Sequence, residues 1–143
     1  MLLNAAQPEM IQVWEKQTSN KPTHQGYISN NEKTYDSVLS ITSEMFQREI
    51  LESGQPVILA VYASWCGACQ KSAPVFAELS REYSGAIKFA QFNVSSEEKL
   101  VRQLGIKMIP TYLFYKNGQI VDRSVGLINR SDFILKIANA FRK

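Results

Sequence analysis

Two cysteines separated by two residues, Cys66 and Cys69, are the only thiols among 143 residues. They follow an unbroken apolar run, 57–63, that has the length of a β-strand, and they precede a helix-compatible segment, 70–83. Cys66 therefore belongs at the mouth of that helix, where unpaired N–H groups and the helix dipole stabilise a thiolate. The thiolate is the nucleophile in disulfide exchange, and two thiols at this spacing can close and reopen a disulfide. The motif predicts redox chemistry.

Other uses of the two cysteines are less favoured. A pair of buried, inert thiols fits the same spacing, but it gives no reason for placing both at a helix start. Two cysteines exclude a disulfide framework, and the single histidine, His24, leaves too few ligands for a four-ligand zinc site. We expect no metal site and no bound cofactor.

Composition is that of an ordinary globular domain. Apolar residues make up 45% of the chain and the net charge is +3. No basic run is interleaved with aromatic residues, as nucleic-acid binding would favour, and no apolar stretch is long enough to span a membrane. The N-terminal residues lack the basic and apolar regions of a secretory signal. We expect a cytoplasmic monomer that binds neither nucleic acid nor membrane.

The chain divides into an N-terminal extension, 1–36, and a domain, 37–143. In the extension Pro8 is suited to the first position of a short helix, and the polar, turn-rich segment 18–31 suits a tether. The extension is expected either to dock on its own domain or fray, or to serve as an arm that binds a partner.

Alternating signals predict the order β-α-β-α-β-α-β-β-α for the domain. A short edge strand, 36–41, precedes a helix capped by Thr42 or Ser43. The apolar strand follows, then a long helix that Pro74 should kink, a strand at 87–94, and a helix begun by Ser95 or Ser96. Asn117-Gly118 predicts a tight hairpin between strands 111–116 and 119–125. Asn129 or Ser131 caps the last helix.

Three features together resemble the thioredoxin family: this order of elements, the segment Trp65 to Cys69 (WCGAC), and the segment 105–111 (GIKMIPT). The resemblance covers about residues 37–143. It implies an α/β thioredoxin fold, with a central mixed β-sheet flanked by helices and preceded here by the extension. It also implies that the Ile109–Pro110 peptide bond is cis and lies against the cysteine pair.

The resemblance implies an activity and a set of site residues. Cys66 is the nucleophile that attacks a protein disulfide, and Cys69 resolves the mixed disulfide and leaves a Cys66–Cys69 bridge. Disulfide-containing client proteins and a thioredoxin reductase, as electron donor, are the implied partners. The implied client-binding residues are Trp65, Gly67, Ala68, Ile109, Pro110 and Gly126.

Four residues depart from the family pattern. Thioredoxins usually have proline where Ala68 stands, and a second tryptophan where Tyr62 stands. They usually bury an aspartate six residues before the first cysteine, with a lysine as its partner. Here these positions are Ala60 and Gln91. That aspartate is thought to accept the proton of the second thiol, so Cys69 must lose its proton to water or to another base.

The sequence therefore predicts a protein-disulfide oxidoreductase of reducing function. Two alternatives stay open. An oxidase or isomerase uses the same chemistry with a less reducing couple, and sequence does not fix the reduction potential. A non-enzymatic binding module keeps the fold only, although such a scaffold has no physical need for a paired thiol.

Overall fold

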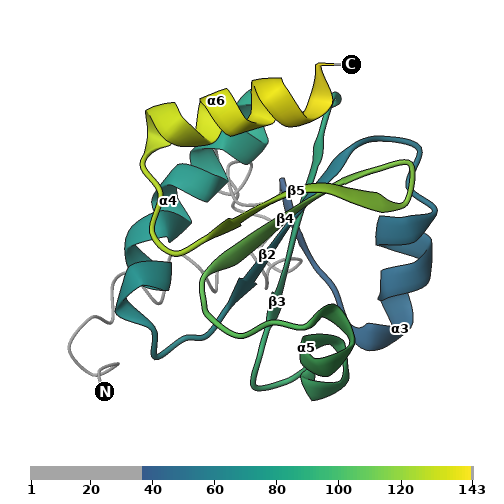
Figure 1. Cartoon of the computed structure of the whole chain (residues 1–143), viewed down its shortest axis with the longest axis vertical. Coiled ribbons are helices and arrows are strands. Elements are labelled where there is room, and N and C mark those ends of the chain that lie inside the picture. The colour runs from purple at the N-terminus through teal and green to yellow at the C-terminus, as the bar shows by residue number, and fades with distance from the viewer. Residues whose placement is uncertain (1–36, 143) are drawn as a thin grey trace, which may run out of the picture.

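The computed structural model describes residues 37–142, and the short helix and tether expected in 1–36 lie outside them. The described chain forms a five-stranded mixed sheet in the order β1-β3-β2-β4-β5 (Figure 1). Strands β1 (Val38–Ser40), β2 (Val57–Tyr62) and β3 (Lys88–Asn93) are parallel. Strands β4 (Thr111–Lys116) and β5 (Gln119–Val125) add to β2 as an antiparallel hairpin. The predicted mixed sheet is confirmed.

Helices cover both faces of this sheet. Helices α4 (Gly67–Glu82) and α6 (Arg130–Phe141) lie on one face. Helix α3 (Ser43–Phe46), which continues as the π-helical turn η3 (Gln47–Leu51), lies with α5 (Glu98–Leu104) on the other (Figure 1). Helix α4 runs through Pro74 as a single element, and a kink at this proline stays a prediction. None of the helices in the described range has the length and hydropathy that a membrane span requires.

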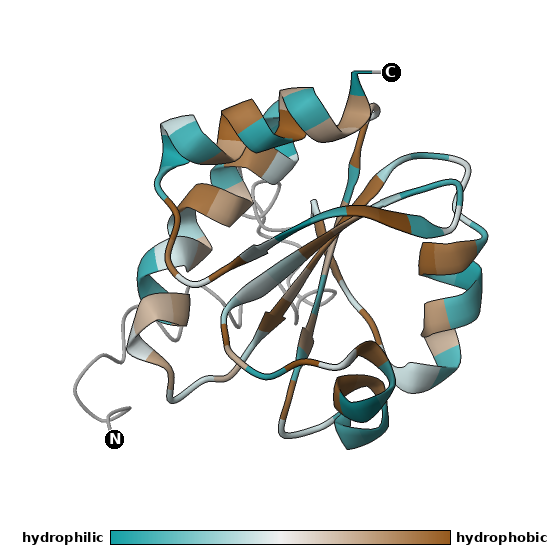
Figure 2. Ribbon diagram, viewed as in Figure 1, coloured by the Kyte–Doolittle hydropathy of each residue, from teal (hydrophilic) through white to brown (hydrophobic). Residues whose placement is uncertain are grey.

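Strand β2 is the centre of the molecule, and all six of its residues are buried. Its side chains alternate between two apolar clusters. Ile58 and Ala60 face α4 and α6, whereas Leu59 and Val61 face α3 and α5. Hydrophobic colour accordingly runs along the central strands and polar colour along the outer helix surfaces (Figure 2). The prediction of a strand buried on both faces is confirmed.

The β4–β5 hairpin turns at Asn117 and Gly118, which both have positive φ, 53° and 80°. That is the backbone that a tight hairpin with right-handed strand twist requires, and Asn-Gly supplies it at low cost. The hairpin brings the end of β5 back to the start of β4, where the Gly126 N–H donates to the Pro110 carbonyl oxygen at 2.7 Å.

Helix capping follows the sequence only in part. Asn129 caps α6, because its side chain accepts a hydrogen bond from the Asp132 N–H. The predicted serine cap of α5 was wrong: the helix begins behind Glu97. The Glu97 carboxylate instead accepts hydrogen bonds from the N–H and hydroxyl of Ser43, both at 2.9 Å, and so joins the loop before α5 to the start of α3.

Candidate active site

Cys66 is the N-cap residue of α4. Its backbone is extended (φ −96°, ψ 116°), so the chain leaves the loop after β2 and enters the helix here. The Cys66 sulfur accepts a hydrogen bond from the backbone N–H of Cys69 at 3.2 Å. A side-chain oxygen usually occupies this capping place, and a sulfur there lies at the positive end of the helix dipole. The start of α4 therefore directs a backbone N–H and the positive end of the helix dipole at the Cys66 sulfur.

Cys69 lies one turn inside the same helix and is the more deeply buried thiol. Its exposed fraction is 1%, against 9% for Cys66. Burial raises the pKa of Cys69, and its hydrogen bond to the Cys66 sulfur raises that pKa further. Both cysteines are free thiols, so the structure represents the reduced protein. Cys69 is thus held as a neutral thiol beside a more accessible sulfur.

The loop before β4 lies against the cysteine pair. The Ile109–Pro110 peptide bond is cis, as expected. The Ile109 carbonyl oxygen lies 4.0 Å from the Cys66 sulfur, at the limit of a sulfur hydrogen bond. The Thr111 hydroxyl donates to the Met108 carbonyl oxygen at 2.6 Å and closes the turn around Pro110. Gly126 joins the group through its bond to Pro110.

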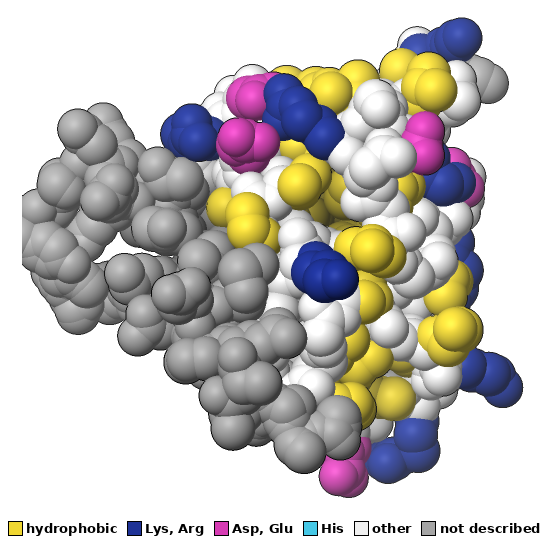
Figure 3. Space-filling view, turned by 90° about the vertical axis from the view of Figure 1, so that its left-hand side faces the viewer, with side chains coloured by type: hydrophobic (Ala, Val, Ile, Leu, Met, Phe, Trp, Pro, Cys, Tyr) yellow, Lys and Arg dark blue, Asp and Glu magenta, His cyan; other side chains and the backbone are white. Residues whose placement is uncertain are grey.

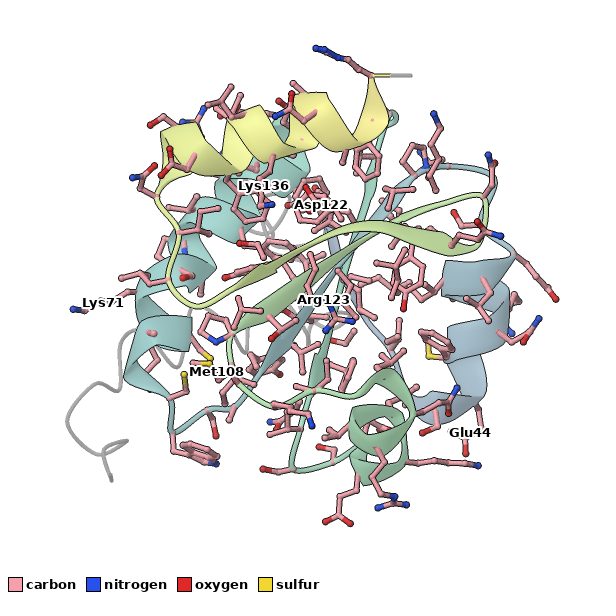
Figure 4. All side chains as sticks on the ribbon, viewed as in Figure 1. Glu44, Lys71, Met108, Asp122, Arg123 and Lys136 are labelled. Carbon is pink, nitrogen blue, oxygen red and sulfur yellow. The ribbon has the colours of Figure 1, made fainter. Side chains whose placement is uncertain are left out.

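An open apolar pocket of about 230 Å³ lies beside this loop. Trp65 forms one wall and is 48% exposed, so it is not a core residue. Met108, 59% exposed, forms another, and Figure 4 shows it on the side of the molecule where α4 lies. On the described part of that side, hydrophobic side chains run down the surface and charged ones gather mainly at its upper and lower ends (Figure 3). The pocket is lined by Trp65, Val94, Val101, Ile106, Lys107, Met108 and Ile109.

Each predicted site residue falls into one of two groups. Trp65, Gly67 and Ala68 belong to the loop and first turn that carry the cysteines. Ile109 and Pro110 belong to the opposing loop, and Gly126 is bonded to it. The sequence did not single out Met108 or the remaining pocket residues, because their proximity to Trp65 depends on how α5 and the next loop pack on the sheet.

A row of side chains crosses the sheet beneath the cysteines. Strand register places Ser40, Gln91, Ala60 and Tyr112 side by side on four neighbouring strands. The Gln91 amide donates to the Ser40 hydroxyl at 3.2 Å, and its side-chain oxygen is buried without a partner among the described residues. Ala60 is fully buried and contributes only a methyl group. Within residues 37–142, no three His, Cys, Asp or Glu side chains are grouped to hold a metal ion.

Comparison with known proteins gives a consistent result. The family model described as thioredoxin matches residues 37–139. "Thioredoxin 1" of Nostoc sp. is 37% identical over 91 residues, which are 64% of this chain and 85% of the relative. "Thioredoxin" of Chlorobaculum thiosulfatiphilum is 38% identical over 96 residues, 67% and 89% of the two chains. "Thioredoxin" of Haemophilus influenzae is 37% identical over 94 residues, 66% and 88% of the two chains.

Proposed function

The chain belongs to the thioredoxin family and is a protein-disulfide oxidoreductase, and on this premise we propose how its own residues reduce a protein disulfide. Cys66 is the nucleophile and Cys69 the resolving thiol. The observation that carries this assignment is the capped position of the Cys66 sulfur, which receives the Cys69 N–H while Cys69 itself stays buried.

The reaction runs in two exchanges. The Cys66 thiolate attacks one sulfur of the client disulfide, and the other client sulfur leaves as a thiolate and takes a proton from solvent. Cys69 then loses its proton and attacks the Cys66 sulfur, so that the second client sulfur leaves. The client gains two electrons and two protons, and the protein is left with a Cys66–Cys69 disulfide.

The client segment is placed against Trp65, Ile109 and the neighbouring pocket. A protein that must recognise many different clients does so best through backbone contacts, because every extended client segment offers the same N–H and C=O groups. The residues proposed to hold it are Trp65, Gly67, Ala68, Ile109, Pro110 and Gly126. The apolar pocket suits a client side chain next to the attacked cysteine.

The protein also needs an electron donor and a compartment in which its thiols stay reduced. A thioredoxin reductase or a similar protein dithiol returns electrons to the Cys66–Cys69 disulfide. The protein acts as a cytoplasmic monomer, in a compartment that keeps thiols reduced. The direction of exchange depends on the reduction potential, and titration of the couple against glutathione measures it directly.

The test of the two roles uses insulin as the disulfide substrate. Cys69→Ser is expected to accumulate a covalent adduct between Cys66 and an insulin chain, which dithiothreitol releases. Cys66→Ser, the matched control, is expected to accumulate almost none. An adduct on Cys69 in the control would reverse the roles. Failure of the wild-type protein to reduce insulin, with no adduct in either variant, would refute the proposed function.

A further inference from the structure

Tyr112 of β4 is the largest polar side chain beneath the cysteine pair. It is fully buried and lies directly opposite Ala60 in the antiparallel β2–β4 ladder. Its ring packs against Phe76 of α4 and Phe133 of α6, with ring centroids 5.7 and 5.0 Å away. Tyr112 therefore belongs to the same buried cluster as Cys66, Cys69 and Ala60.

The hydroxyl of Tyr112 has no hydrogen-bond partner among the described residues, although it is fully buried. Burying a hydroxyl without a partner costs free energy, so such a group calls for an explanation. The neighbouring Ser72 hydroxyl donates its one proton to the Ala68 carbonyl oxygen at 3.0 Å and so has none left to donate to Tyr112. The Ser72 side chain does not meet hydrogen-bond geometry with Tyr112, although it lies close enough to affect that phenol.

The same side chain packs in the buried cluster that holds both thiols. Burial raises the pKa of Tyr112, the Ser72 side chain lowers it, and negative charge on Cys69 and then on Cys66 raises it again. A phenolic O–H that points toward the Cys69 sulfur stabilises negative charge on that sulfur. Because Ala60 adds only a methyl group, Tyr112 is the polar group that the opposite strand supplies there.

We propose that the Tyr112 hydroxyl donates a hydrogen bond to the Cys69 sulfur while that sulfur attacks Cys66, and so speeds resolution of the mixed disulfide. The inference rests on the proposed roles of the two cysteines. Before the attack Cys69 is a neutral thiol, and its proton passes to solvent water or hydroxide. The new bond joins the Cys69 and Cys66 sulfurs, and the Cys66–client bond breaks. Tyr112 keeps its own proton throughout.

Tyr112 is a donor in this step and not a base. A neutral phenol is a very poor proton acceptor, and a buried phenolate beside a forming thiolate would be repelled by it. A donor aimed at a developing charge in a buried site, by contrast, acts without reorganisation. Tyr112 is therefore a positioning residue that acts through Cys69.

Few other ionisable groups face Cys69. Helix α4 contributes Cys66 and directs its charged residues to solvent, while β2 contributes Tyr62. Elsewhere on this side of the sheet, Asp122 of β5 and Lys136 of α6 pair with each other at 3.0 Å and lie side by side in Figure 4. Tyr112 is the member of this set whose hydroxyl is buried without a partner.

The test follows the reaction of the full, reduced chain with dithiobis(nitrobenzoate), which releases one coloured thiolate when Cys66 attacks and a second when Cys69 resolves the adduct. Tyr112→Phe keeps the ring and removes only the hydroxyl. The first release is expected to keep its rate, and the second to slow by about tenfold, the effect of losing a hydrogen bond to a charged group. The pH profile of the second release should move up by about one unit.

Tyr115→Phe is the matched control. Tyr115 is also buried, and its hydroxyl has no hydrogen-bond partner within residues 37–142, but it lies on the opposite face of the same strand, in the cluster with Phe46. Both releases should keep their rates in this variant. In a Cys66→Ala background, carbon-13 NMR of the labelled Cys69 β-carbon should report a higher Cys69 pKa with Tyr112→Phe and no change with Tyr115→Phe.

The possible outcomes distinguish the proposed role of Cys66 from the proposed role of Tyr112. A wild-type protein that shows no first release refutes the proposed role of Cys66. A normal first release with an unchanged second release and an unchanged Cys69 titration in Tyr112→Phe refutes the role of Tyr112. Loss of thermal stability in Tyr112→Phe, with both rates kept, also refutes it and leaves Tyr112 a packing residue.

Discussion

The backbone N–H of Cys69 donates a hydrogen bond to the sulfur of Cys66 at 3.2 Å, so the two cysteines differ in environment although they are one helical turn apart. Cys66 lies at the helix start, and burial raises the pKa of Cys69.

Iodoacetamide at neutral pH should therefore modify Cys66 first, because only thiolates react. Peptide mass spectrometry after brief labelling measures the ratio. Labelling in denaturant is the control, in which the two rates should become similar; faster labelling of Cys69 in the folded protein would contradict this assignment.

Gly118 couples the β4–β5 hairpin to the end of η3. Its φ is +80°, and a Cβ built there would lie 2.8 Å from the Leu51 carbonyl oxygen, closer than real contacts allow. Gly118→Ala should lower the free energy of unfolding by about 2 kcal/mol, from backbone strain and the clash together. Gly54→Ala is the control, since a Cβ at Gly54 meets nothing within 4 Å. Denaturant unfolding measures both, and equal losses would refute the explanation.

Asn117 and Gly118 show what the sequence can predict. Asn117-Gly118 identifies the hairpin because the required positive φ is a local property of those residue types. The strand β2 and the cap at Asn129 are likewise determined by nearby residues. The contact of Gly118 with Leu51 is not, since it depends on how η3 packs beside the hairpin. The serine cap predicted for α5 failed for the same reason: the helix begins behind Glu97, whose carboxylate accepts hydrogen bonds from Ser43, 54 residues away.

The candidate site divides in the same way. The Cys-x-x-Cys motif and the cis peptide before Pro110 were predictable, the latter through the family resemblance. Tyr112 gave no local signal, because in sequence it is one aromatic residue in an apolar strand. Its place opposite Ala60 follows from the strand order and the β2–β4 register. Absence of an acid at Ala60 was visible in the sequence, whereas the group facing that position was not.

Three buried acidic groups predict how stability depends on pH. Burial raises the pKa of Cys69, of Tyr112 and of Tyr115, the last to about 12 against the opposing charge of Arg123. A raised folded pKa favours the neutral form, so this stability is complete below the unfolded values of 9.0 and 10.0 and is lost as pH rises toward the folded ones. The reduced protein should therefore lose stability above about pH 9, by about 1.4 kcal/mol per pH unit for each group ionised only when unfolded.

Urea unfolding at a series of alkaline pH values, with the protein kept reduced, measures this loss. Tyr115→Phe removes one of the three groups without touching the cysteines, so its curve should be shallower above pH 10, the ordinary value of a tyrosine. Stability that stays constant between neutral pH and pH 12, or a Tyr115→Phe curve parallel to that of the wild type, would contradict the raised pKa of Tyr115.

The last prediction concerns Ala60 and its neighbour Gln91, which are paired in the parallel β2–β3 ladder and are both fully buried. Ala60→Asp together with Gln91→Lys would place a carboxyl group opposite Tyr112 and a cation beside it. A buried carboxyl group has a raised pKa and can accept a proton near neutrality. The double variant should therefore reduce insulin faster than the wild type near neutral pH, by about tenfold or more where resolution limits the rate. It should also lose several kcal/mol of stability, because an apolar site gains charged groups.

Ala60→Asn, again with Gln91→Lys, is the matched control, since the amide has the shape of the carboxyl group and cannot accept the proton. It should share the loss of stability without the gain in rate. Insulin reduction with excess dithiol, followed across pH, compares the three proteins. In the wild type the rate should climb with pH, because Cys69 must lose its proton to water or hydroxide, and the double variant should flatten that climb. A wild type already insensitive to pH, or an Ala60→Asn variant as fast as the Ala60→Asp variant, would show that proton acceptance at this position does not limit the reaction.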